Sequence, residues 1–123
     1  MLTKAEISKF FKDRAILRDM ELTLEDLKDL KPEELPDAAR ARMERDLKAE
    51  IAEEWARMEP AAEEMRAIAK RIPQLDRREA FRLHYLDGLS WNEVGYVYAL
   101  SGQCIKKRCT RALLLLMELD AAR

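Results

Sequence analysis

The sequence predicts an all-α protein. Its composition suits helices, because 48% of the 123 residues are hydrophobic and 38% are charged, with only 3 Gly and 4 Pro. Apolar residues recur every three or four positions over long stretches, whereas few stretches alternate with the period of two typical of strands. We therefore expect a helical N-terminal hairpin or bundle over residues 1–71 and a trihelical unit over residues 72–123.

The first helical stretch begins at a capping box. Thr3 can accept a hydrogen bond from the backbone three residues ahead, and Glu6 can bond back to the cap. The apolar stripe that follows consists of Ile7, Phe10, Phe11, Leu17 and Met20. Thr23 could cap a second short helix, and one continuous helix through Thr23 is the alternative. Pro32 and Pro36 then predict the turn of a hairpin.

The second helical stretch is expected to begin at Asp37, whose side chain could cap it. Its apolar residues recur at helical spacing and are Met43, Leu47, Ile51, Trp55, Met58, Ala62, Met65, Ala69 and Ile72. This period is typical of helix-packing core rather than of a cofactor site. A proline inside a helix removes one hydrogen bond and clashes with the carbonyl four residues back, so we expect a kink or a break at Pro60.

The C-terminal unit contains four further helix start and stop signals. Asp76 is a candidate cap for a supporting helix, and Gly88 is a candidate stop for it. Ser90 and Glu93 then form a capping box, and Ser101 can cap one more helix. Two short helices separated by a tight turn are the helix-turn-helix motif, so we expect helix 101–119 to be its second helix.

Charge is distributed unevenly along the chain. Residues 1–70 carry 14 basic and 18 acidic side chains, a net charge of −4. Residues 71–123 carry 9 basic and 6 acidic side chains, a net charge of +3. A basic C-terminal unit is the part suited to a polyanion such as double-stranded DNA, which is the partner we expect.

The candidate DNA-binding residues lie around the start of the second helix, where helix-turn-helix proteins read the major groove. Those expected to face bases are Gly102, Gln103 and Lys107. Those expected to hold phosphates or position the helix are Ser101, Lys106, Arg108 and Arg111. Ser90 and Trp91, at the start of the preceding helix, are expected to touch the DNA backbone.

Residues 72–119 resemble region 4 of bacterial sigma factors. The matching segments are Arg78-Glu79, the run from Leu83 to Ser90, Glu93-Val94-Gly95, Ser101, Ile105-Lys106, and Arg111-Ala112-Leu113 closing on Leu116. A helical N-terminal half joined to such an end is similar to the small sigma-like late-gene regulators of phages and prophages, of the ArpU and RinA type. The resemblance implies a sequence-specific transcription regulator, with host RNA polymerase as a candidate partner.

The last helix departs from that pattern, because four consecutive leucines cover nearly every direction around a helix. We expect an interface formed by Leu114, Leu115, Met117 and Leu119. These side chains would pack on the N-terminal helices or on a second copy of the chain, since in water they would form an apolar patch.

Two other functions are compatible with the sequence. The chain could be a protein-interaction module that binds RNA polymerase without reading DNA, as sigma region 4 also does. It could instead resemble a phage small-terminase packaging protein, which would combine DNA binding with a ring of many copies.

An enzyme is not expected, and neither is a cofactor or a metal. The only histidine, His84, is expected to be exposed or beside the DNA groove, and no phosphate-binding or nucleophile motif occurs. Cys104 and Cys109 lie five residues apart on one helix and cannot easily form a disulfide with each other. Cys109 is expected to be a small core residue. Without an apolar run of membrane-spanning length or a signal peptide, a cytoplasmic location is the expectation.

Overall fold

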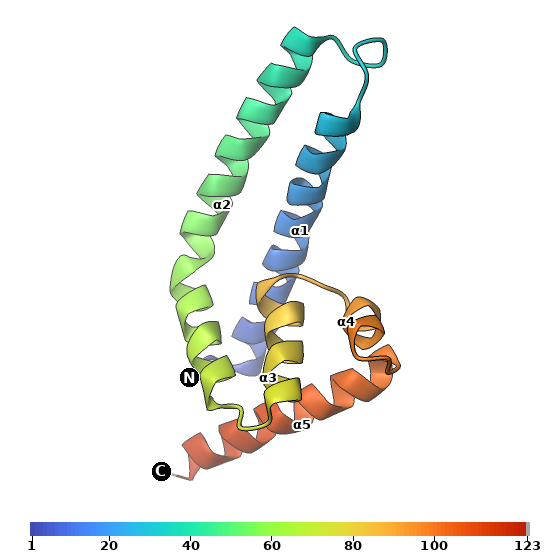
Figure 1. The fold of residues 1–123 in the computed structure, drawn as a ribbon. Coiled ribbons are helices and arrows are strands. Elements are labelled where there is room, and N and C mark those ends of the chain that lie inside the picture. The colour runs from blue at the N-terminus through green and yellow to red at the C-terminus, as the bar shows by residue number, and fades with distance from the viewer. Residues whose placement is uncertain (123) are drawn as a thin grey trace.

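The computed structural model describes residues 1–122, and within them all regular structure is helical, which confirms the predicted all-α class. The elements are α1 (Lys4–Asp29), α2 (Asp37–Arg71), α3 (Leu75–Phe81), the π-helical turn η1 (Arg82–Leu86), α4 (Trp91–Val97) and α5 (Gly102–Ala121). Figure 1 shows α1 and α2 as a long antiparallel hairpin, with the shorter helices and α5 gathered at the end opposite its turn. No helix among the described residues is long and apolar enough to cross a membrane.

The first helix begins as its sequence predicts and then runs without interruption. Thr3 Oγ1 accepts a hydrogen bond from the Glu6 amide at 3.2 Å, and the Glu6 carboxylate accepts one from the Thr3 amide at 3.1 Å. At Thr23 the continuous alternative is correct, because its hydroxyl donates to the Asp19 carbonyl of the same helix at 2.8 Å instead of capping a new one.

The start of α2 differs from the prediction. Pro36 occupies the cap position and makes no side-chain capping bond, while Asp37 is the first helical residue. The Asp37 carboxylate pairs with Arg40, whose other guanidinium nitrogen donates to the Leu30 carbonyl at 2.6 Å. Arg40 therefore joins the two sides of the hairpin turn, and the expected Asp37 cap is wrong.

The helix α2 continues through Pro60, so a break at this position is wrong. Proline cannot donate the backbone hydrogen bond that the Ala56 carbonyl would otherwise accept. Both Ala56 and Pro60 lie on the exposed side of α2, where water can satisfy that carbonyl. The surface position explains why the proline is accommodated within one helix.

The segment α3–η1 begins at Gln74, which makes no side-chain capping bond, so the predicted Asp76 cap is wrong. Asp76 lies in the first turn instead, where its charge favours the helix N-terminus. The segment ends as predicted: Gly88 follows the last turn with a φ of +79°, a conformation that costs glycine little.

A single large core joins the hairpin to the C-terminal unit. Its buried members are Leu2, Ile7, Phe10, Leu17, Met58, Ala62, Met65, Ile68, Ala69, Ile72, Phe81, Ala112, Leu113 and Leu116. A smaller core of Ala80, Val94, Ile105 and Cys109 lies between α3, α4 and α5. Residues 1–71 and the following unit therefore share packing. Cys109 is a buried core residue as predicted, and burial raises the pKa of its thiol to about 11.

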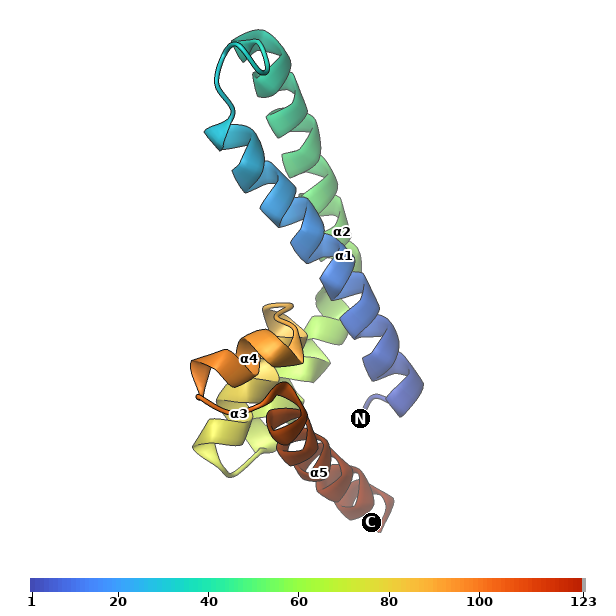
Figure 2. The ribbon, with the colours of Figure 1, turned by 90° about the vertical axis from the view of Figure 1, so that its right-hand side faces the viewer.

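Burial is concentrated at one end of the hairpin. Residues 21–50, which we call the distal arm, extend away from the other helices, as Figure 2 shows. Leu27 is the only fully buried residue in this segment. The N-terminal part of the predicted α2 stripe is consequently not core: Met43 is 47% exposed and Leu47 is half-buried. The apolar stripe predicts helix α2 correctly, but it does not show how far along α2 other helices pack against it.

Candidate nucleic-acid interface

The residues 98–101 form a tight turn between α4 and α5. The predicted caps of both helices are confirmed. At the start of α4 the Ser90 hydroxyl accepts from the Glu93 amide at 3.2 Å, and at the start of α5 the Ser101 hydroxyl accepts from the Cys104 amide at 3.1 Å. These bonds satisfy amides that helix starts leave without an internal partner. The positions at which both helices begin are therefore set by the local sequence.

The end of α4 is closed by backbone bonds of the Schellman type. The Leu100 amide donates to the Gly95 carbonyl at 2.9 Å, and the Ala99 amide donates to the Tyr96 carbonyl at 3.3 Å. Ala99 has a φ of +54°, a left-handed conformation that is usually taken by glycine or asparagine. The turn thus stores backbone strain at Ala99.

Two glycines allow α4 and α5 to approach closely. A methyl group at Gly95 would lie 2.5 Å from the Leu100 carbonyl oxygen, and one at Gly102 would overlap the Asn92 side chain. Gly102 is buried by this contact. Because Gly102 is buried against Asn92 of α4, the expectation that it faces DNA bases is wrong.

The outer face of the first half of α5 is basic and open to solvent. Its exposed residues are Ser101, Gln103, Lys106, Lys107, Thr110 and Arg111. No acidic residue occurs between Gly102 and Met117, and none of the ion pairs in residues 1–122 involves these lysines or Arg111. Gln103, Lys107 and Thr110 share one side because they are three or four residues apart. Thr110 was not predicted, although its helical spacing could have identified it.

Arg108 lies on another side of α5. It is half-buried, and its guanidinium is 3.8 Å from the Asp76 carboxylate of α3. Ser90 is exposed but its hydroxyl is engaged in the α4 cap. Trp91 is half-buried with its ring stacked on another ring rather than standing free. The structure therefore brings together Gln103, Lys106, Lys107 and Arg111 and separates Arg108 from them, while Trp91 lies beside Lys106 with its ring stacked on His84.

His84 is buried, so the expectation of an exposed or groove-adjacent side chain is wrong. Its ring stacks between Phe11 of α1, at 4.2 Å between ring centroids, and Trp91 of α4, at 3.7 Å. Its Nδ1 lies 2.7 Å from the Leu89 carbonyl oxygen, a contact that requires a proton on Nδ1. Burial, with a smaller contribution from the charge of nearby Lys106, lowers the His84 pKa to about 4 despite the opposing effect of the Leu89 hydrogen bond, so the ring is neutral at pH 7.

Arg14 fastens α1 to the end of η1. It is buried, and it donates from Nε to the Leu86 carbonyl at 2.6 Å and from Nη2 to the Asp87 carbonyl at 3.1 Å. The guanidinium also pairs with Glu21 at 2.8 Å and lies 4.9 Å from the Trp55 ring centroid. These carbonyls are the ones that a helix end leaves without an internal partner. Arg14 of the hairpin therefore caps the end of the α3–η1 segment, against which α4 and α5 pack.

Arg18, one turn further along α1, reaches α4 itself. It donates to both oxygens of the Glu93 carboxylate at 2.6 Å and to the Gly88 carbonyl at 3.1 Å. Together with the cap bond to Ser90, this contact lowers the Glu93 pKa to about 2. Sequence reasoning identified Glu93 as a local cap but missed Arg18, because no short-range pattern links residues 75 positions apart.

The leucine-rich end of α5 is only partly covered. Leu114 and Met117 are half-buried and face α1, and Met117 packs against the large core. Leu115 and Leu119 are 57% and 59% exposed, so these two do not pack on the N-terminal helices as that alternative expected. Packing on a second copy is the alternative that stays a prediction for Leu115 and Leu119.

Acidic side chains elsewhere in the described residues form no metal site and pair with arginines. Among residues 1–122, no group of three or more His, Cys, Asp and Glu side chains is placed to hold a metal ion. Glu54 pairs with Arg57, and Glu63 pairs with Arg66 at 2.7 Å, which is the arrangement of surface ion pairs on one helix.

Comparisons with protein-family models, with curated proteins and with solved structures find no match for this chain.

Proposed function

We propose that this protein is a sequence-specific, double-stranded DNA-binding transcription regulator whose α4–turn–α5 segment is a helix-turn-helix similar to sigma region 4. The observation that carries the proposal is the outer face of α5, where exposed basic and amide side chains stand together and have no acidic partner. Helix-turn-helix proteins present this part of their second helix to the major groove.

The roles proposed for individual residues follow from their exposure. Gln103 and Lys107 read base edges, since an amide and an ammonium group pair well with adenine and guanine edges respectively. Lys106 and Arg111 hold DNA phosphates on either side of the residues that read bases. Exposed Ser101, whose hydroxyl caps α5, lies at the helix start, where the DNA backbone would pass. Arg108 keeps an orienting role through Asp76 rather than a phosphate contact.

The resemblance to sigma-like late regulators gives this proposal its biological setting. In that setting the protein acts on phage or prophage genes, and host RNA polymerase is its second partner. The packing between the hairpin and the C-terminal unit supports one rigid DNA-binding unit. Arg14 and Arg18 of α1 bind η1 and α4, the segments that position α5. The hairpin would then position the DNA-binding unit rather than touch bases.

The first test is selection of binding sites from a random pool of duplex DNA near physiological salt. Enrichment of a motif of several base pairs supports specific reading, and the symmetry of that motif reports the number of subunits. Weak, salt-sensitive binding without an enriched motif would contradict the proposal, because non-specific binding needs only phosphate contacts.

Three variants then locate the interface by fluorescence anisotropy over a salt series. Lys107→Ala should cost about 1–3 kcal/mol on the selected site and relax its sequence preference. Arg111→Ala should weaken all DNA about equally and reduce the magnitude of the salt slope by about 1. Lys48→Ala, which removes an exposed charge from the distal arm, is the matched control and should leave both quantities unchanged. Intact binding in both α5 variants would remove α5 from the interface.

Exposed Leu115 and Leu119 favour a second candidate, a protein-interaction module or a small-terminase-like packaging protein. Light scattering after size exclusion separates these possibilities. A ring of many copies supports the packaging role. A small species that captures RNA polymerase but enriches no DNA motif supports the interaction module instead.

A further inference from the structure

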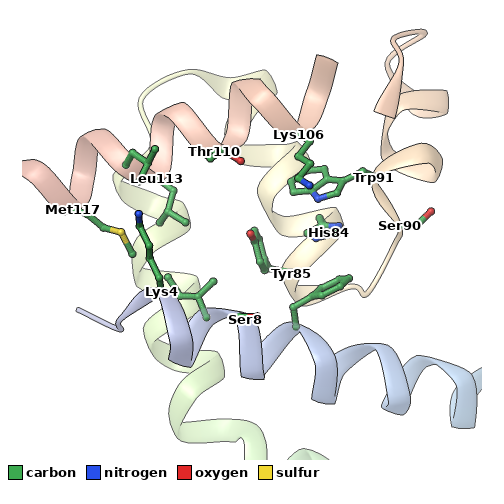
Figure 3. A pocket seen from close by; sticks show the side chains of 13 residues that line it. Lys4, Ser8, His84, Tyr85, Ser90, Trp91, Lys106, Thr110, Leu113 and Met117 are labelled. Atoms are coloured by element: carbon green, nitrogen blue, oxygen red, sulfur yellow. The ribbon is translucent and has the colours of Figure 1, made fainter. Parts of the chain in front are cut away.

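A cavity of about 580 Å³ lies between α1, η1, the start of α4 and the middle of α5. Small-molecule sites commonly have volumes of roughly 300–1,000 Å³ and largely apolar walls. Here the walls include Phe11, Tyr85 and Trp91 on one side and Leu114 and Met117 on the other. In Figure 3 the lining residues Lys4 and Ser8 come from the hairpin, and Tyr85, Trp91 and Met117 come from the C-terminal unit.

The charged groups around this cavity all have the same sign. Lys4 of α1 and Lys106 of α5 line it, and no Asp or Glu is among the lining residues. Neither lysine takes part in an ion pair within residues 1–122. In Figure 3 Lys4 and Lys106 lie on either side of Tyr85, whose hydroxyl has no hydrogen-bond partner among the described residues.

We propose that this cavity binds a small amphipathic organic anion, of the size of an aromatic carboxylate. Its apolar body would lie against the Phe11 and Trp91 side of the cavity, where aromatic edges and faces are available. Its carboxylate would be held by Lys4 and Lys106, with the Tyr85 hydroxyl as a further donor. A neutral molecule of the same shape would leave both exposed ammonium groups paired only with water, and a cation would be repelled.

The position of Lys106 links this cavity to DNA binding, a step that rests on the proposed function. Lys106 and Thr110 line both the cavity and the outer face of α5, which Gln103, Lys107 and Arg111 complete. An anion bound to Lys106 neutralises one of the charges proposed to hold phosphate. The ligand should therefore lower DNA affinity without contacting the residues proposed to read bases.

The direct test uses 1-naphthoate as the probe, with naphthalene-1-methanol as its neutral counterpart, added to the whole chain without DNA. Amide chemical shifts recorded by NMR should move for residues lining the cavity, and naphthoate should bind about tenfold more tightly than the alcohol, as expected for a charge-assisted hydrogen bond. Lys106→Gln and Lys4→Gln should each remove most of that difference. Equal affinities for the two probes, or shifts scattered outside the cavity, would overturn the proposal.

A second variant pair tests the location independently of charge. Ser8 is exposed on α1 and lines the cavity, whereas Lys12, one turn further along α1, is exposed and does not. Ser8→Trp should fill the cavity and abolish naphthoate binding, and Lys12→Trp should leave it unchanged. Unchanged binding in a folded Ser8→Trp protein would also overturn the site.

The link to DNA is measured last and separately. Naphthoate should weaken DNA binding by the wild-type chain and have no effect on Ser8→Trp, which keeps every residue of the α5 face. Naphthoate binding without any change in DNA affinity would overturn the link. Absence of DNA binding in every sample would refute the proposed function while the DNA-free NMR result still decides the site.

Discussion

The burial of His84 makes the stability of the protein depend on pH in a defined window. The folded-state pKa is about 4, whereas an unburied histidine titrates near 6.5. Between these values the unfolded chain binds a proton that the folded chain does not, so acid favours unfolding. The stability contributed by neutral His84 is complete above pH 6.5 and is lost as the pH falls toward 4.

The size of the effect follows from the two pKa values. Linkage between proton binding and folding gives a loss of roughly 2 kcal/mol between pH 7.5 and pH 5, and of roughly 3 kcal/mol once the pH is below 4. His84 is the only histidine in the chain, so no other imidazole titrates in this window. Glu93, whose pKa is lowered from 4.5 to about 2, contributes its own loss of stability only below about pH 4.5, so measurements between pH 7.5 and 5 report on His84.

Urea unfolding followed by circular dichroism at several pH values between 7.5 and 5 measures this loss. The control is His84→Phe, which keeps an aromatic ring between Phe11 and Trp91 but cannot titrate. It should be less stable at pH 7.5, because the Leu89 carbonyl loses its donor, yet its stability should vary much less with pH. The NMR titration of the His84 ring gives the folded-state pKa directly. A ring that titrates near 6.5, or the same pH slope in both proteins, would refute the reasoning.

Three further changes test the α4–α5 turn and its attachment to α1, each by urea unfolding. Ala99→Gly should stabilise the protein by about 0.5–1 kcal/mol, because relief of the left-handed strain exceeds the added chain entropy. Gly102→Ala should destabilise it by about 1–3 kcal/mol through overlap with Asn92. Arg18→Gln should cost about 1 kcal/mol and raise the Glu93 pKa, since the paired carboxylate loses its cation.

Each of these outcomes has an opposite that would count against the structure. A destabilised Ala99→Gly would indicate that the turn is not left-handed at this residue. An unaffected Gly102→Ala would mean that α4 and α5 lie further apart, and an unchanged Glu93 pKa in Arg18→Gln would mean that α1 does not reach α4.

The parts of the fold that the sequence predicts correctly depend on neighbouring residues. The caps at Thr3, Ser90 and Ser101 are contacts over three residues, and the stop at Gly88 needs only its own backbone freedom. Asp76 fails as a cap for the same local reason, because the helix starts two residues earlier than predicted, with Gln74 at the cap position, and this places Asp76 inside the first turn.

The parts that the sequence does not predict depend on how the helices pack against one another. His84 is buried because Phe11 covers it, and Gly102 is buried because α4 lies against it. Neither contact has a periodic signature in the chain. The basic residues of α5 were identified because charge and helical spacing can be read directly, but Arg108 could not be separated from them until α3 was placed beside it.

The distal arm also determines how the molecule opens under native conditions. Backbone amides in helices exchange with solvent hydrogen when a segment unfolds, and segments with little buried apolar surface open without disturbing the rest. Leu27 is the only fully buried residue over 21–50, whereas Met58, Ala62, Met65, Ile68 and Ala69 anchor the other end of α2 in the large core. Amide hydrogen exchange should therefore be fastest beside the hairpin turn, and its rate should fall progressively along α1 and α2 toward that core. The same two helices then contain both weakly and strongly protected amides.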